Sequence, residues 1–289
     1  MFNQKNKKMK TKWNLITAGL IISLLVFVPE SLRGQSEKAF VNKYLTKLPS
    51  VNLSKALTKY RMTAVYTNRD LYGKFTGKIK VVGDYTRGLP GDSVIWNNAV
   101  ISNSQKYEDP FPQGTRQEYM ENFKYVPSDK MIKAEAFKDF PLNPENVYAR
   151  NLVWDMYTFD IYSWLFYDSL KLNIPYVIPD IQGEFDMAEI GKYEHNKTIL
   201  CWKGVSVVRG ELCAVIEFNS FDNLIQLSMG QIKTKGTEQY WGTVYLSLKT
   251  KLIEEAVMYS GTIQEVEIAG MKDKFLIKTI RELNVEKIQ

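Results

Sequence analysis

The feature that most constrains this chain is an alternation of apolar and polar residues that fills its last third. Side chains that alternate in this way point to opposite faces of a β-strand. Short joints rich in Gly, Lys and Asn separate the alternating runs, as at 248–252. The pattern predicts an antiparallel meander of up to eight strands. The expected strands are 193–202, 205–208, 211–218, 223–231, 237–248, 252–259, 261–268 and 274–283.

The middle third has a different rhythm. A helix is expected over 130–140, and a long or kinked helix over 145–172, where Asn143 is typical of an N-cap and Pro144 of a first helical position. The second helix is dense in aromatic residues, so it should be buried on more than one side.

Strands are also expected before this helical segment, at 60–66, 71–82 and 93–102. Strands on both sides of a helical insertion favour an α+β fold that is mainly β. We therefore expect a strongly curved antiparallel sheet, a half-barrel, that wraps an inserted aromatic helical segment at about 128–172.

Residues 1–34 have the composition of an export signal. Lysines precede an apolar run from Leu15 to Val28, which ends at Pro29. A signal peptide has an apolar core of roughly 7 to 15 residues, whereas a bilayer span needs about 20. We expect cleavage near Gly34, a periplasmic or extracellular location, and one β-rich domain over 35–289 that begins with a short amphipathic helix. An uncleaved membrane anchor is the alternative.

The charge balance argues against nucleic acid as a partner. The whole chain carries a net charge of +6, but six of its 38 basic residues and one of its 32 acidic residues lie in the expected signal. The remaining chain has 32 basic and 31 acidic residues. Binding to a phosphate backbone requires a basic surface. Nearly equal numbers of basic and acidic residues do not predict such a surface.

Few residues of this chain suit catalysis or metal binding. Its one histidine, His195, lies in a polar stretch where we expect a solvated turn, and no Gly-x-Ser-x-Gly motif surrounds any serine. Zinc sites use three or four Cys, His or carboxylate ligands at short spacing, and the chain has two cysteines, Cys201 and Cys213. No metal site and no cofactor is expected.

The two cysteines allow two states. If Arg209 and Gly210 form a two-residue hairpin turn, Ser206 lies opposite Cys213, and Cys201 is out of register with Cys213. A bulge near Gly204 would change that register. Two free thiols are favoured over a disulfide, because cysteine readily acts as a small core residue.

Carboxylates beside aromatic residues suggest one enzymatic alternative. Asp155, Asp160 and Asp168 lie among tryptophans and tyrosines of the helical segment, and Glu254 and Glu255 lie on a late strand. Glycoside hydrolysis needs two carboxyl groups that face each other at about 5 to 10 Å. Asp155 and Asp160 are five residues apart and do not share a helix face closely, so a structural role at the wet edge of the helix is favoured.

The run from Lys235 to Tyr259 consists of one strand, a short turn with a charged tip and the next strand. This cadence resembles that of uncharacterised secreted half-barrel proteins of Bacteroidetes-type bacteria. It is more distantly similar to that of periplasmic lipoprotein carriers with an unclosed β-barrel. The resemblance covers roughly 193–283, and the aromatic segment 143–172 departs from the carrier pattern.

The resemblance implies a non-enzymatic exported protein whose curved sheet holds an apolar small molecule or a lipid, with the helical segment as lid or plug. The residues expected to line this hollow are Trp154, Tyr157, Ile161 and Trp164. If these side chains fill the hollow completely, the protein is instead a structural or protein-interaction module of the cell envelope, with an envelope protein as its partner. A carboxylate-dependent glycoside hydrolase is the third possibility.

Overall fold

The computed structural model describes residues 46–141, 145–179 and 183–288. Three predicted features lie outside these ranges. They are the signal peptide, most of the short helix expected after it, and the helix start at Asn143 and Pro144. Within them, no helix is long and apolar enough to cross a membrane.

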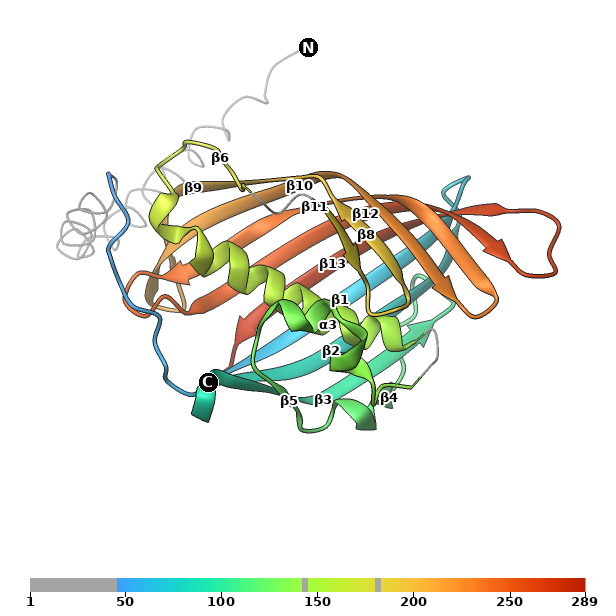
Figure 1. The fold of residues 1–289 in the computed structure, drawn as a ribbon, viewed down its shortest axis with the longest axis horizontal. Helices are drawn as coiled ribbons and strands as arrows, with labels where there is room; N and C mark the ends of the chain where they lie inside the picture. Colours follow the sequence, from blue (N-terminus) through green and yellow to red (C-terminus); the bar gives the residue numbers. More distant parts are fainter. Residues whose placement is uncertain (1–45, 142–144, 180–182, 289) are drawn as a thin grey trace, which may run out of the picture. The chain divides into compact units, whose positions relative to one another are not determined.

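One antiparallel sheet dominates the described chain (Figure 1). Along the sheet the strands follow the order β4-β3-β2-β1-β13-β12-β11-β10-β8-β7, while β5 pairs with β3, and β9 pairs with β10 and β6. The two ends of this order do not pair with each other in the described chain, so the sheet is not closed into a barrel. The expected mainly β fold with an unclosed sheet is confirmed. The strands are β1 (Thr58–Asp70), β2 (Phe75–Leu89), β3 (Ser93–Ser104), β4 (Thr115–Arg116), β5 (Phe123–Tyr125), β6 (Tyr176–Val177), β7 (Gly183–Asp186), β8 (Gly191–His195), β9 (Lys197–Val208), β10 (Glu211–Met229), β11 (Ile232–Ser247), β12 (Ile253–Ile268) and β13 (Phe275–Lys287).

Strands β10 and β12 each join two of the strands that the sequence predicts. Strand β10 runs through the break expected near residue 220, because a bulge between Ser220 and Asn223 absorbs the change in alternation. Strand β12 runs through Gly261, which pairs with Gln239 on one side and Ile280 on the other. A glycine in extended backbone does not end a strand when both neighbouring strands continue past it.

The hairpin between β9 and β10 agrees with the sequence prediction in register. Val208 pairs with Glu211, and Cys213 pairs with Ser206. Arg209 and Gly210 have φ values of 50° and 83°, which suit a two-residue hairpin turn. The register shifts between Val215 and Ile216, opposite Gly204 and Trp202, so a bulge is present near Gly204.

Helix α3 (Asn146–Asp160) is the long helix of the structure and lies across one face of the sheet (Figure 1). It continues into a π-helical turn at Ile161–Leu165 and, after Phe166, a 3-10 turn at Tyr167–Ser169. The long or kinked helix predicted over 145–172 is thus present in three pieces, but its end is wrong, because the backbone is extended at Leu170.

The prediction of a helix over 130–140 is wrong. Two 3-10 turns, Asp129–Ile132 and Ala134–Phe137, occupy this segment, with Lys133 between them in extended backbone. Ser128 makes no side-chain capping bond. The buried Met131 and Phe137 are placed by tertiary packing rather than by helix periodicity.

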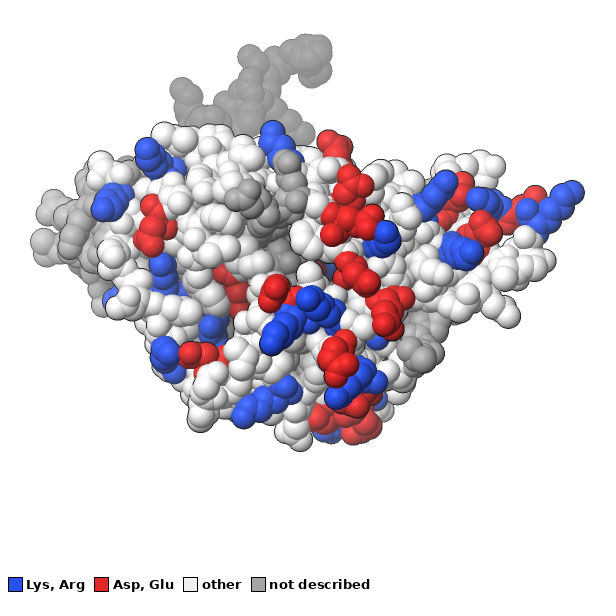
Figure 2. Space-filling view, viewed as in Figure 1, with Lys and Arg blue, Asp and Glu red and all other residues white. Residues whose placement is uncertain are grey.

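Alternation along the strands defines two faces of the sheet. The face that α3 covers, here the covered face, carries buried side chains that include Ile216, Phe218, Tyr240, Val244, Ala256 and Met258. The opposite face, here the outer face, carries Glu217, Asn219, Trp241, Thr243, Val257 and Tyr259. On the side of the molecule that carries α3, basic and acidic side chains are interspersed (Figure 2). This side has no field of a single sign among the described residues.

Candidate functional site: the helix–sheet trough

The candidate site, here called the trough, is the contact between α3 and the covered face. Helix α3 turns an apolar stripe toward this face, in which Leu152, Val153 and Phe159 are 0% exposed and Met156 is 1% exposed. The rings of Phe159 and Phe218 meet edge to face with centroids 6.0 Å apart. Burial of side chains of this size stabilises the contact by roughly 1.5 to 3 kcal/mol each.

A buried ion pair links the middle of α3 to β13. Nη1 of Arg281 donates to Oδ2 of Asp155 at 3.1 Å, and both side chains are almost fully buried. Nη2 of the same guanidinium lies 4.0 Å from Oε1 of Glu238 on β11. Nearby, Asn151 of α3 donates its side-chain amide to Oη of Tyr66 on β1 at 3.1 Å. The helix therefore has direct polar ties to β13 and β1 at this point, and Arg281 links this contact to β11.

A second buried ion pair lies at the C-terminal end of α3. Nη1 of Arg87 on β2 lies 3.4 Å from Oδ1 of Asp160, and both side chains are nearly buried. The guanidinium of Arg87 also lies over the ring of Trp164, 3.8 Å from its centroid. This arrangement combines an ion pair with a cation–π contact in a desolvated place.

Burial changes the protonation of both helix carboxyl groups. Desolvation raises the pKa of Asp160 to about 7, although the charge of Arg87 opposes this shift. Desolvation likewise raises the pKa of Asp155 to about 6, against the opposing charge of Arg281. A raised pKa means that removal from water outweighs the attraction of the arginine. Each of these carboxyl groups is therefore protonated more easily than an exposed aspartate.

The four residues predicted to line the hollow are half-buried. Trp154 donates its indole N–H to the Met131 carbonyl at 2.9 Å and packs edge to face on Phe137. Trp164 donates its indole N–H to the Lys251 carbonyl at 2.7 Å. Other residues of α3 face the sheet. The two tryptophans instead bind backbone carbonyl groups of neighbouring segments, at the margins of the trough. Tyr157 and Ile161 are also partly exposed, and ligand binding by all four stays a prediction.

His195 does not lie in a solvated turn, and that expectation is wrong. The residue is 5% exposed at the end of β8. Its Nε2 lies 2.8 Å from Oγ1 of Thr198, 3.2 Å from Oγ of Ser220 and 3.2 Å from Oη of Tyr240. Oη of Tyr240 is in turn 2.7 Å from Oη of Tyr162, in the π-helical turn that follows α3. The polar sequence around His195 conceals its burial, because β8 turns the ring toward the covered face.

The carboxylates considered for catalysis have separate partners. Asp155 and Asp160 pair with different arginines, and Asp168 is exposed and lies 3.9 Å from Nζ of Lys251. Glu254 accepts a hydrogen bond from Nζ of Lys287 at 2.6 Å, and Glu255 lines a depression of the outer face. No two of these five carboxyl groups face each other across an open cleft.

Cys201 and Cys213 are free thiols in the structure. Cys201 pairs with Glu217 and Cys213 with Ser206, which places the two cysteines at different points of the β9–β10 ladder. Among the described residues, no group of three or more His, Cys, Asp or Glu side chains could hold a metal ion.

Sequence reasoning missed Arg87, Arg281 and Glu238. A signal for the two arginines exists, since each occupies an alternation position shared with buried residues, Tyr85 in β2 and Leu283 in β13. A basic residue on an apolar face requires a partner. The identity of that partner depends on the docking of α3.

Comparison with known proteins adds little to this description. No family model matches the chain, and no curated protein matches it significantly. Among solved structures, a DUF1329 family protein from Desulfovibrio piger is similar at 10% sequence identity, with 81% of this chain and 87% of that chain covered. The TM-score of 0.13 is too low to define a common fold.

Proposed function

We propose that this is an exported, non-enzymatic binding protein that holds an apolar or lipid-like ligand, such as an acyl chain, between α3 and the covered face. In this proposal α3 is a lid that separates from the sheet. The main support is the pair of buried ion pairs, Arg281 with Asp155 and Arg87 with Asp160, in an otherwise apolar contact.

Buried ion pairs are poor devices for permanent packing. Apolar residues of similar volume at such positions are often neutral or stabilising by about 1 to 4 kcal/mol. Both carboxyl groups have a raised pKa because burial outweighs the attraction of the arginines. When α3 lifts, all four charged groups regain water, which offsets part of the apolar area exposed. Charges at these two contacts therefore favour a helix that leaves the sheet.

The surface under the lid suits an apolar ligand. The covered face there includes many aliphatic and thioether side chains from both halves of the sheet. These include Met62, Ala64, Ile216, Val244, Ala256, Met258 and Leu283, which are all buried. An acyl chain that replaces the stripe of α3 would keep this surface out of water.

The chain after α3 provides a place for the helix to bend. The π-helical turn Ile161–Leu165 follows Asp160 directly, and Phe166, with φ −110° and ψ 5°, ends the helical backbone. π-Helical turns are rare and occur often at functional sites. A change of backbone angles at Phe166 would move α3 while Tyr167 stays packed.

The first test is co-purification. The full chain is expressed with its own N-terminus, purified from the periplasm of a bacterial host and measured by native mass spectrometry, with lipid analysis of an organic extract. We expect near-stoichiometric lipid, and a mass that corresponds to cleavage near Gly34. Titration with a dansyl-labelled fatty acid then gives an affinity.

Variants assign the site. Trp154→Ala and Trp164→Ala should weaken fatty acid binding at least several-fold, because in this proposal each removes a large apolar ring that contacts the ligand beside the helix. Trp241→Ala, on the outer face, should bind as the unmodified protein does. A clean mass, with no fatty acid uptake by any of these proteins, would refute the proposal.

The alternative is a structural or protein-interaction module of the cell envelope. The complete burial of Leu152, Val153 and Phe159 favours it, since these side chains already fill the space beneath the helix. Absence of lipid in the experiment above, together with a specific envelope protein recovered by cross-linking in the native host, would support this function. Glycoside hydrolysis is the third candidate, and the separate ion pairs of its carboxylates do not favour it.

A further inference from the structure

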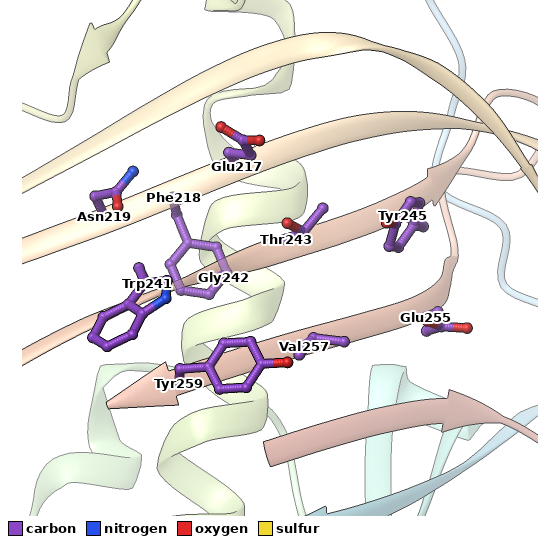
Figure 3. Close-up of a pocket in the computed structure, with 10 residues that line it drawn as sticks. All are labelled: Glu217, Phe218, Asn219, Trp241, Gly242, Thr243, Tyr245, Glu255, Val257 and Tyr259. Atoms are coloured by element: carbon purple, nitrogen blue, oxygen red, sulfur yellow. The ribbon is translucent and has the colours of Figure 1, made fainter. Parts of the chain in front are cut away.

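An aromatic pair lies on the outer face, opposite the trough. Trp241 of β11 and Tyr259 of β12 are direct cross-strand partners. Their ring centroids are 6.1 Å apart and their planes differ by 26°. The residues remain 44% and 40% exposed. Figure 3 shows the two rings side by side on the same face, so that together they form a broad, flat apolar surface.

Polar side chains surround this aromatic platform, which we define as Trp241 and Tyr259. Asn219 of β10 pairs with Trp241, and Glu217 pairs with Thr243 in the next row. Tyr245 and Glu255 form a third row. All of them line a shallow depression of about 420 Å³ (Figure 3). The depression thus combines flat aromatic faces with amide, hydroxyl and carboxylate groups, which donate and accept hydrogen bonds.

The charges of the depression are balanced. Oε2 of Glu217 lies 3.7 Å from Nζ of Lys203, and Oε2 of Glu255 lies 3.4 Å from Nη2 of Arg209. Neither a polyanion nor a strongly cationic ligand would gain much from such a surface. The depression also suits an acyl chain poorly, because it is open and many of the side chains that line it are polar.

The platform is held by the strands beneath it. Gly242 lies between Trp241 and Thr243, and a Cβ at this position would lie 2.6 Å from Cζ of Phe218 and would also meet the Val257 carbonyl. The absence of a side chain lets Phe218 pack against the backbone of β11 from the covered face. The aromatic rings therefore stand on a part of the sheet that is packed tightly on its other side.

We propose that this platform is a binding site for a neutral oligosaccharide. The C–H groups on one face of a pyranose ring pack against an aromatic face, and its ring hydroxyl groups then need lateral hydrogen-bond partners. Asn219, Thr243, Glu217 and Glu255 provide such partners beside the rings. Two aromatic rings with centroids 6.1 Å apart offer contact to more than one sugar ring. The site is independent of the trough, since it lies on the opposite face of the sheet.

The test uses defined saccharides and the purified full chain. Tryptophan fluorescence and calorimetric titrations are made with cellohexaose, chitohexaose, mannohexaose and xylohexaose, and pull-downs with insoluble cellulose and chitin. Heparin and single-stranded DNA serve as polyanions. We expect at least one neutral saccharide to bind and the polyanions not to bind at physiological salt.

Substitutions locate the site. Trp241→Ala and Tyr259→Ala should each weaken saccharide binding at least tenfold, while Trp241→Phe should retain part of it. Tyr72→Ala, which removes an aromatic side chain that is 91% exposed in the β1–β2 turn, is the matched control and should leave binding unchanged. Thermal unfolding checks that the variants fold. No binding by any neutral saccharide, binding of the polyanions only, or binding that survives the double variant Trp241→Ala/Tyr259→Ala would overturn the proposal. Fatty acid binding by the same variants tests the trough separately.

Discussion

Arg281 of β13 and Asp155 of α3 form a buried hydrogen-bonded ion pair, with Nη1 and Oδ2 3.1 Å apart, across 126 residues of sequence. This contact joins the covering helix to the last strand of the sheet. Because Glu238 of β11 approaches the same guanidinium at 4.0 Å, one arginine coordinates two acids from different elements. The position of the helix on the sheet thus depends on a charge that is almost completely removed from water.

Removal of this arginine should be strongly destabilising. Arg281→Met leaves Asp155 and Glu238 without their cation, and loss of one partner of a buried ion pair costs about 3 to 5 kcal/mol. Urea unfolding monitored by tryptophan fluorescence measures the change in the free energy of unfolding. The double variant Arg281→Met/Asp155→Leu should recover much of the loss. Arg61→Met, which breaks the exposed pair with Asp84, should change stability by less than about 1 kcal/mol. Equal losses of stability in Arg281→Met and Arg61→Met would contradict the assignment of Arg281 to a buried ion pair.

Stability should depend on pH through Asp160. Burial raises the pKa of this carboxyl from 3.8 to about 7, so between these values the folded protein binds more protons than the unfolded chain. The stabilisation from protonated Asp160 is therefore fully present below about pH 4 and is lost as the pH rises to about 7. Unfolding free energies of the protein and of Asp160→Asn, measured from pH 4 to 8, should diverge within this window, with the unmodified protein losing more. Parallel curves would show that Asp160 is ionised throughout.

Gly242→Ala should destabilise the sheet. The new methyl group would meet Cζ of Phe218 and the Val257 carbonyl, and a backbone atom cannot move aside cheaply. Overpacking of this kind costs about 1 to 3 kcal/mol. Gly261→Ala in β12 is the matched control, because its Cβ would meet no atom within 4 Å. Differential scanning calorimetry of both variants should show a lower Tm for Gly242→Ala alone.

The two cysteines should behave as independent thiols. Burial raises the pKa of Cys213 to about 12, so little thiolate exists at this position at neutral pH. In the native protein at pH 8, Cys213 should react with a thiol reagent far more slowly than the half-buried Cys201. Denaturation without reductant should release two reactive thiols, and dithiothreitol should leave Tm unchanged. A Tm that falls on reduction would reveal a disulfide.

Local patterns determined much of the fold in advance. Alternation in 193–283 predicted an antiparallel meander, and the Arg209–Gly210 turn predicted the register that pairs Cys213 with Ser206. These features could be predicted because strand alternation and hairpin turns depend on neighbouring residues alone. The aromatic helix between the strands was predictable for the same reason, but the position of its π-helical turn at Ile161–Leu165 was not.

Tertiary structure alone decided which side of each element is buried and what it meets there. The sequence around His195 is polar, yet the ring lies in a buried network, because β8 pairs with a distant part of β10. The sequence did not indicate which residues of the helical segment face the sheet, and the docked helix turns Leu152, Val153 and Phe159 to it. Arg87 and Arg281 find their acids only after α3 has docked. Trp241 and Tyr259 become one surface only when β11 and β12 pair, because a cross-strand contact depends on register between strands rather than on neighbours in sequence.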